Sequence, residues 1–153
     1  MIIWGTVFKN PGHLRKCFSQ MIGAKETFKK TERLCSQKII SLLFESGNVF
    51  YSSFYKVIWI KSPVRMPSPA QVVFSIPKMG FRHAVVRNLI KRRIKEAYRK
   101  KKDFLYKFLT GRNICIAMII IYRNPSVPDY QSVEKSIDET LKKLTLMISD
   151  REI

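Results

Sequence analysis

Hydrophobic positions along the chain recur with two different periods, one near four residues and one near two, and the change of period divides the chain into elements. After Thr31, a residue type that often caps helices, apolar side chains follow helical spacing up to Gly47, a common helix stop. The apolar side chains are Leu34, Ile39, Leu42 and Leu43. The pattern predicts a first helix between Thr31 and Gly47.

Three later segments have the composition of β-strands. Residues 49–61 are rich in aromatic and β-branched side chains and predict a long first strand, either continuous or divided in two. Residues 62–69, SPVRMPSP, have the composition of a turn, and residues 70–76 form a second strand. Residues 113–122 are almost entirely apolar and lie between Gly111 and Pro125. They predict a strand that is buried on both faces in the middle of a sheet.

Two further segments return to the helical period. A turn at residues 77–80 precedes a basic helix from about Arg82 to about Lys102, or on to Phe108, with apolar residues at positions 86, 90, 94 and 97. A last helix opens at Pro128 and Asp129, and its apolar residues recur every three or four positions.

The order of these elements predicts an α/β fold, a two-layer sandwich of helices on one small sheet. The two strands that flank the basic helix are expected to be parallel, because a hairpin turn cannot contain a helix. Within the 153 residues we expect one domain at residues 28–149. Residues 1–27 are interpreted as an N-terminal extension, either flexible or produced by a misassigned start, and residues 150–153 as a short tail.

Charge is the strongest compositional signal. The chain has 29 Lys and Arg against 11 Asp and Glu, a formal net charge of +18. Such an excess repels itself unless a polyanion neutralises it, and nucleic acid is the usual partner. An acidic membrane surface and plain solubility are the alternatives. No apolar run approaches the roughly twenty residues of a membrane-spanning helix, and the three cysteines form no CxxC pair. The first twenty residues lack a sustained apolar core and a small-residue cleavage site, so we expect no secretion signal. We therefore expect a cytoplasmic protein with no membrane partner.

The basic helix places its charges away from its apolar face. At 100° per residue, Val86, Ile90, Ile94 and Ala97 share one quadrant, and the opposite side is basic. A solvated face normally mixes both signs, but Glu96 is the single acid within residues 84–102. Phosphates would relieve this repulsion. The predicted nucleic-acid-binding residues on this face are Arg87, Asn88, Lys91, Arg92, Lys95 and Arg99. Arg82, in the turn before the helix, is a further candidate.

The sequence gives no sign of a catalytic centre in the protein itself. Of the 11 acids, six lie at or beyond Asp129, and no pair is spaced to hold a metal. His13 and His83 have no nearby nucleophile or carboxylate partner. We expect no catalytic residue and no metal ligand in the chain.

Residues 72–99, VVFSIPKMGFRHAVVRNLIKRRIKEAYR, resemble the signature of the bacterial ribonuclease P protein subunit, a strand and turn leading into a helix of the form A-V-x-R-N-R-x-K-R. Residues 28–47 resemble the first helix of that family, and the resemblance covers about residues 28–147. Leu89 departs from the pattern, because the family has Arg there. Arg93 or Arg82 would compensate. Lys95 stands where Arg is common, which keeps the charge but loses the fork of donors.

The resemblance implies a subunit that binds a large catalytic RNA, which cleaves the 5′ leader from precursor tRNA with Mg²⁺ held mainly by the RNA. It also implies the fold of the second domain of ribosomal protein S5, a small mixed sheet with a left-handed crossover around the basic helix. The basic helix would face the catalytic RNA, and a cleft between the first helix and the sheet would take the leader. The expected cleft residues are Ile40, Phe44, Lys56, Ile58 and Lys78, which supply apolar platforms and cations.

Two alternatives stay open at this point. Phe44, Tyr55 and Trp59 fit core positions about as well as stacking positions. A non-catalytic RNA-binding protein, such as a ribosomal component, would have the same charge. A DNA-reading helix fits less well, because a helix packed within an α/β layer does not enter a major groove easily, and we expect no DNA partner.

Overall fold

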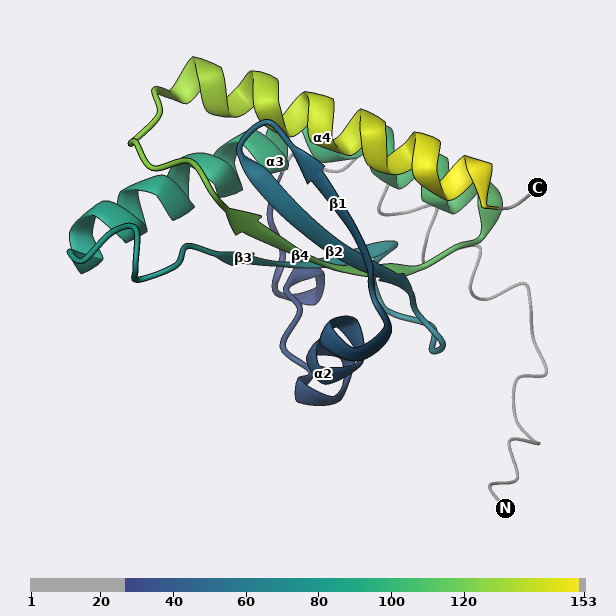
Figure 1. Cartoon of the computed structure of the whole chain (residues 1–153). Helices are drawn as coiled ribbons and strands as arrows, with labels where there is room; N and C mark the ends of the chain where they lie inside the picture. The colour runs from purple at the N-terminus through teal and green to yellow at the C-terminus, as the bar shows by residue number, and fades with distance from the viewer. Residues whose placement is uncertain (1–26, 152–153) are drawn as a thin grey trace.

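The computed structural model describes residues 27–151 and shows one sheet with helices on both of its faces (Figure 1). In chain order the elements are the 3₁₀ turn η1 (Lys30–Glu32), α2 (Gln37–Ser46), β1 (Asn48–Ser52), β2 (Tyr55–Lys61), β3 (Ala70–Ser75), α3 (Ala84–Arg112), β4 (Ile116–Tyr122) and α4 (Tyr130–Asp150).

The sheet is mixed, and its strand order is β1-β2-β4-β3. β1 pairs with β2, and β2 with β4, in antiparallel fashion, whereas β3 and β4 are parallel. The parallel pair around α3 and the central position of β4 confirm the predictions. α3 and α4 lie side by side on one face, and α2 lies against the other (Figure 1). The mixed α/β sandwich is therefore confirmed, with the short α2 added on the second face.

Alternation along the strands sends side chains into two separate cores. Tyr55, Val57 and Trp59 of β2 belong to the large core that the sheet shares with α3 and α4. Ile58 belongs to a smaller cluster on the opposite face, under α2. Tyr55 is fully buried and Trp59 is 4% exposed, so both are core residues and neither is a stacking platform.

The first helix begins later than predicted. Its N-cap is Ser36, whereas Thr31 lies inside η1. The segment after η1 runs along the edge of β3, where Arg33 bridges to Val72 and the Leu34 N–H donates to the Val72 carbonyl at 3.1 Å. Leu34 is buried as expected, but on extended backbone rather than in a helix.

Gly47 ends α2 as predicted, and the reason is close packing. Its φ of −68° suits any residue. However, a Cβ there would lie 2.2 Å from the Leu43 carbonyl oxygen and 2.6 Å from Ile58 Cγ2. The absence of a side chain therefore lets α2 end directly against β2. The long predicted strand is divided into β1 and β2 by the turn at Ser53 and Phe54.

α3 runs further than predicted, to Arg112, and passes through Gly111 without ending. It stops at Asn113, which adopts the left-handed conformation with φ 57° and whose N–H bonds back to the carbonyls of Leu109 and Thr110. The following strand accordingly begins at Ile116 and not at Asn113. α4 begins as predicted, with the Asp129 side chain accepting from the Ser132 N–H.

The described residues contain no helix that is both long enough and apolar enough to span a bilayer. Cys35 and Cys115 have free thiols. Cys17, His13 and almost all of the expected N-terminal extension lie outside the described residues.

Candidate RNA interface

α3 packs with the face that its periodicity predicted. Ile90, Ile94 and Ala97 are buried against the sheet and α4, and Val86 is partly buried at the edge of the same core. Four of the predicted RNA-binding residues are exposed, namely Arg82, Asn88, Lys91 and Arg92, and three are half-buried, namely Arg87, Lys95 and Arg99.

Arg87 has a local role that the sequence did not reveal. Its Nη1 donates to the carbonyl oxygens of Phe81 at 2.7 Å and Arg82 at 2.8 Å. These bonds tie the turn before α3 to the first turn of the helix. Arg87 therefore holds Arg82 and its neighbours in place, and its other guanidinium N–H groups are the ones available to a partner.

Arg93 is directed toward the start of α4, because its Nη1 donates to the Pro128 carbonyl oxygen. Leu89, which stands at the position where Arg was expected, is 38% exposed. On a helical projection Arg93 lies about 40° from Leu89, but its guanidinium is committed to the α4 side. Arg82, which is exposed, is thus the better placed of the two cations considered as compensation for Leu89.

Positive charges gather around Lys95 without an acid to offset them. Its Nζ lies 5.6 Å from the centre of the Phe28 ring. Burial, and then the charges of Arg33 and Lys91, lower the pKa of Lys95 below its ordinary value. Within residues 27–151, no ion pair involves Arg82, Arg87, Lys91, Arg92 or Lys95. This part of the surface is therefore electropositive and unneutralised by the described chain.

The later cations of α3 have partners inside the protein. Arg99 donates twice to Glu96, at 2.9 and 2.7 Å, and these bonds hold the pKa of Glu96 below its usual value. Lys101 lies 3.8 Å from Glu134 of α4, and Lys102 makes a buried ion pair with Glu32 at 2.5 Å. Lys100 Nζ lies 5.2 Å from the centre of the Tyr130 ring, and the Tyr130 hydroxyl raises the pKa of Lys100.

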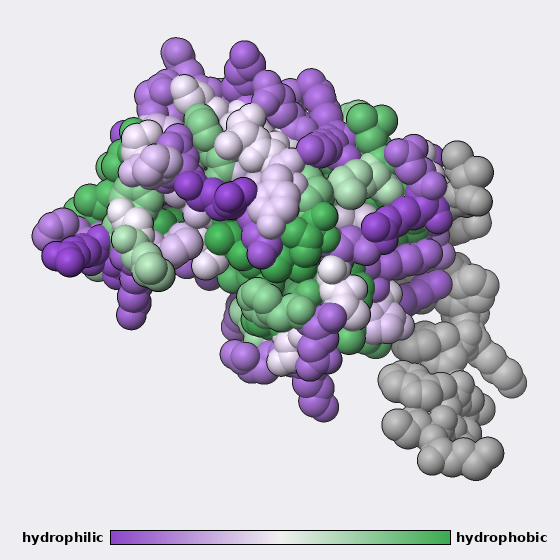
Figure 2. All heavy atoms as spheres, in the orientation of Figure 1, coloured by the Kyte–Doolittle hydropathy of each residue, from purple (hydrophilic) through white to green (hydrophobic). Residues whose placement is uncertain are grey.

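A second candidate surface lies on the sheet face beside α2. The register aligns Ile58 with Ile119 and Lys56 with Ile121 across β2 and β4. Ile58 is buried under α2, Ile40 is partly buried against the same cluster, and Lys56 is half-buried at its edge. Figure 2 shows apolar surface at the centre of the view, between the hydrophilic surfaces of α4 above and α2 below.

Phe44 does not belong to the core, since 63% of its side chain is exposed on α2. It lies one helical turn after Ile40, so α2 presents both residues along the open part of the sheet. Lys78 is exposed in the turn that follows β3 and is not part of this strand surface. Four of the five expected cleft residues are thus brought together, and Lys78 stands apart.

Tyr51 and Arg123 belong to the same surface, and the sequence analysis missed them. Tyr51 pairs with Lys56 across β1 and β2 and is 52% exposed. The Arg123 guanidinium lies 4.7 Å from the centre of the Tyr51 ring. The alternation of the hairpin places Tyr51 on the face of Lys56, which is a signal that pairing the two strands would have revealed.

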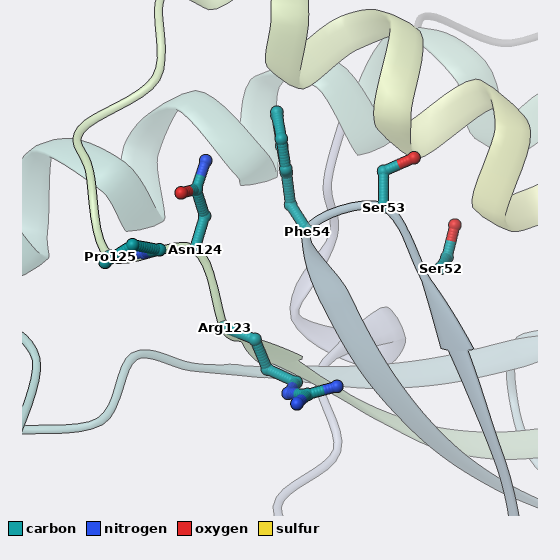
Figure 3. A pocket seen from close by; sticks show the side chains of 6 residues that line it. All are labelled: Ser52, Ser53, Phe54, Arg123, Asn124 and Pro125. Carbon is teal, nitrogen blue, oxygen red and sulfur yellow. The ribbon is translucent and has the colours of Figure 1, made fainter.

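Arg123 also lines a shallow pocket of about 310 Å³ between the β1–β2 turn and the loop before α4. Figure 3 shows that Phe54 and Ser53 point toward the helices while Arg123 points the other way. The Ser53 hydroxyl donates to Glu139, and the Asn124 side-chain oxygen accepts from Ser126. The polar groups around the pocket are therefore largely engaged within the protein.

No group of three or more His, Cys, Asp or Glu side chains within residues 27–151 is arranged to hold a metal ion. His83 is exposed at the N-cap of α3 and makes no side-chain capping bond.

Comparisons with known proteins agree on one family. The family model named Ribonuclease P matches residues 28–145. The Ribonuclease P protein component of Chlorobium phaeobacteroides is 31% identical over 130 residues, covering 78% of this chain and 89% of the relative. The component of Petrotoga mobilis is 31% identical over 122 residues, covering 78% of this chain and 96% of the relative.

Solved structures support the same fold. The RNase P protein of Staphylococcus aureus aligns with a TM-score of 0.58 at 19% identity, covering 75% of this chain and 96% of that one. The RNase P protein of Thermotoga maritima aligns with a TM-score of 0.56 at 19% identity, covering 73% and 96%. At 19% identity these alignments show that the chain has the same fold as the two solved proteins.

Proposed function

The chain belongs to the ribonuclease P protein family, and from this premise we propose that it binds the catalytic RNA of ribonuclease P through the first half of α3 and helps that RNA remove the 5′ leader of precursor tRNA. It is a protein component of an endoribonuclease, an accessory subunit. The family does not favour the alternative of a ribosomal component.

One observation carries the proposed RNA contact: the cations of residues 84–95 and of the preceding turn have no acidic partner within residues 27–151. Lys91 and Arg92 are exposed, and so is Arg82 in the preceding turn, whose backbone carbonyl accepts from Arg87. Placing such charges side by side costs free energy because they repel each other. Binding to RNA phosphates offsets this cost, and each neutralised phosphate also releases counterions. The predicted contacts are Arg82, Arg87, Asn88, Lys91, Arg92 and Lys95, with Arg99 sharing its guanidinium with Glu96.

The leader of precursor tRNA is assigned to the sheet face beside α2. Single-stranded nucleic acid is bound by stacking platforms interleaved with cations, and stacking accepts any base. Phe44 and Tyr51 are exposed aromatic rings there, and Lys56 and Arg123 are the cations. Ile40 is the partly exposed apolar residue beside them, Ile58 is buried at 3% exposure and supports the surface from beneath rather than touching the leader, and Lys78 would reach only a more distant phosphate.

In this proposal the RNA performs the chemistry. Magnesium would be held mainly by the catalytic RNA, and the protein would position the leader and shield phosphate repulsion. The proposal places the complex in the cytoplasm, with precursor tRNA as substrate and DNA not among the partners.

Reconstitution tests the proposal. The catalytic RNA of the source organism should process precursor tRNA at low magnesium with the protein and poorly without it. The same protein added to an RNA of equal length and unrelated fold is the control. Processing by the protein alone, or no gain over the RNA alone, would contradict the proposal.

The leader surface has its own test in the reconstituted complex. Phe44→Ala should weaken binding of precursor tRNA by roughly 5- to 150-fold, the range for losing one stacked base, while binding of mature tRNA stays the same. Phe104→Ala is the matched control, because Phe104 is 55% exposed in the second half of α3, away from the sheet face. Equal losses of affinity for precursor and mature tRNA would contradict the proposal that the leader binds this surface.

A further inference from the structure

The outward face of the first half of α3 is not uniformly charged. Val85 is 79% exposed and Leu89 is 38% exposed, and the two are neighbours one turn apart. Asn88 is exposed beside Leu89, and Arg92 is exposed one turn further along the helix. Hydrophilic and hydrophobic atoms accordingly lie side by side at the left end of Figure 2, over the N-terminal turns of α3.

Neither apolar side chain belongs to the buried residues of either core cluster. In this half of α3 the buried residues are Ile90, Ile94 and Ala97, and on a helical projection they lie about 80–180° away from Val85 and Leu89. Single exposed apolar residues are ordinary, but here two of them occupy the centre of the surface that is proposed to contact RNA.

Phosphates alone do not explain this composition. A side chain such as Leu89 gains nothing from a phosphate, and contact with a duplex backbone would desolvate the phosphate oxygens without a hydrogen bond. The deep, narrow major groove of an RNA duplex also does not admit side chains to the bases. Unpaired nucleotides present both a backbone for cations and an apolar base face.

We propose that Val85, Asn88, Leu89 and Arg92 together form a subsite for an unpaired nucleotide of the catalytic RNA. The base packs on Val85 and Leu89, the Asn88 amide pairs with a base edge, and the Arg92 guanidinium binds the adjoining phosphate. This rests on the proposed function and adds to it the kind of RNA element that is bound, a bulge or loop rather than a duplex.

RNA is the ligand proposed for this subsite because the charge around Val85 and Leu89 is positive. No acidic residue lies within residues 84–95, and Arg82, Lys91 and Arg92 are exposed and unpaired by acids of the described chain. Two copies of this face would bring like charges together, so self-association through it is disfavoured.

Leu89→Ala tests whether the subsite contributes an apolar contact, and not a phosphate contact, to binding of the catalytic RNA. Losing an apolar contact should weaken binding to the catalytic RNA about tenfold at every salt concentration, with an unchanged slope of log affinity against log salt. Leu89→Arg should instead steepen that slope by about 0.7–0.9, because it adds a phosphate contact. Leu146→Ala is the matched control, since Leu146 is 65% exposed on α4.

Chemical probing of the RNA supplies a second readout. The wild-type protein should protect at least one unpaired base from dimethyl sulfate or a comparable base reagent. Leu89→Ala and Leu89→Arg should leave that base reactive while the backbone footprint from hydroxyl radicals stays in place. Far-ultraviolet circular dichroism should show the same helix content in all variants, because Leu89 lies outside both cores.

Three results would overturn the subsite: unchanged affinity for Leu89→Ala, an affinity loss that comes with a flatter salt slope, or loss of a protein dimer in sedimentation with RNA binding intact. Failure of the proposed function would look different. In that case the wild-type protein itself would not prefer the catalytic RNA over an unrelated folded RNA.

Discussion

The two halves of α3 are similarly basic in sequence but differ in what surrounds their charges. In residues 84–95 no cation has an acidic partner within the described chain, and Lys91 and Arg92 are exposed. In residues 96–112 four successive cations contact Glu96, Tyr130, Glu134 and Glu32. The first half is therefore arranged for an external polyanion, and the second half fastens α3 to the rest of the protein.

The pKa shifts follow the same division. Burial and the neighbouring cations lower the pKa of Lys95, whereas the neighbouring Tyr130 side chain raises that of Lys100. Positive charge is thus disfavoured by its surroundings in one half and favoured in the other. RNA bound at the first half would supply the anions that the described chain does not.

The largest expected effect is on the buried pair of the second half. Lys102 and Glu32 are 6% and 4% exposed at their side chains, and Glu32 also accepts from the Lys29 N–H at 2.5 Å. Lys102→Met would leave a buried carboxylate without its cation and should lower the free energy of unfolding by about 3–5 kcal/mol. Urea denaturation followed by circular dichroism measures this.

The double variant Glu32→Met with Lys102→Met is the control for that measurement. It removes both charges, so most of the lost stability should return. If the single and double variants are equally unstable, the pair does not act as a compensated charge pair, and the second half of α3 would not be fastened in this way.

Replacing Arg87 should have an intermediate effect on the free energy of unfolding, and it should also affect RNA binding. Arg87 lies in the RNA-facing half but bonds to the carbonyls of Phe81 and Arg82. Arg87→Ala should lower the free energy of unfolding by about 1–2 kcal/mol and also weaken RNA binding. Arg87→Lys keeps the charge and should recover RNA affinity at low salt more than stability. Stability unchanged in both variants would contradict the anchoring role.

Lys101 should have the smallest effect. Its ion pair with Glu134 spans 3.8 Å, and both side chains are about a third exposed. Lys101→Ala should change the free energy of unfolding by less than about 0.5 kcal/mol in urea denaturation. If Lys101→Ala lowered the free energy of unfolding as much as Lys102→Met, the difference in exposure between the two lysines would not determine how much each contributes to stability.

The sequence could predict the features that depend on local periodicity. The buried face of α3 follows from residues spaced three and four apart, and the central position of β4 follows from its uninterrupted apolar run. The start of the first helix was wrong because Thr31 has the side chain of a helix cap but sits where Glu32 meets Lys102. That contact joins segments far apart in the chain and leaves no periodic signal.

The same limitation applies to the candidate site. Lys102 and Lys91 look alike in sequence, but of the two it is Lys102 that has an acid beside it, Glu32 of η1. Tyr51 and Arg123 come together only through the pairing of β1, β2 and β4. Phe44 had two possible interpretations until the position of α2 on the sheet showed that its ring faces solvent.

The salt dependence of binding to the catalytic RNA tests the division of α3 most directly. Lys91→Ala and Arg92→Ala should each lower the slope of log affinity against log salt by about 0.7–0.9, because each removes one phosphate contact. Lys101→Ala, on the same helix but paired with Glu134, should leave the slope unchanged. Equal slopes for all three variants would contradict the claim that the first half of α3 binds the RNA.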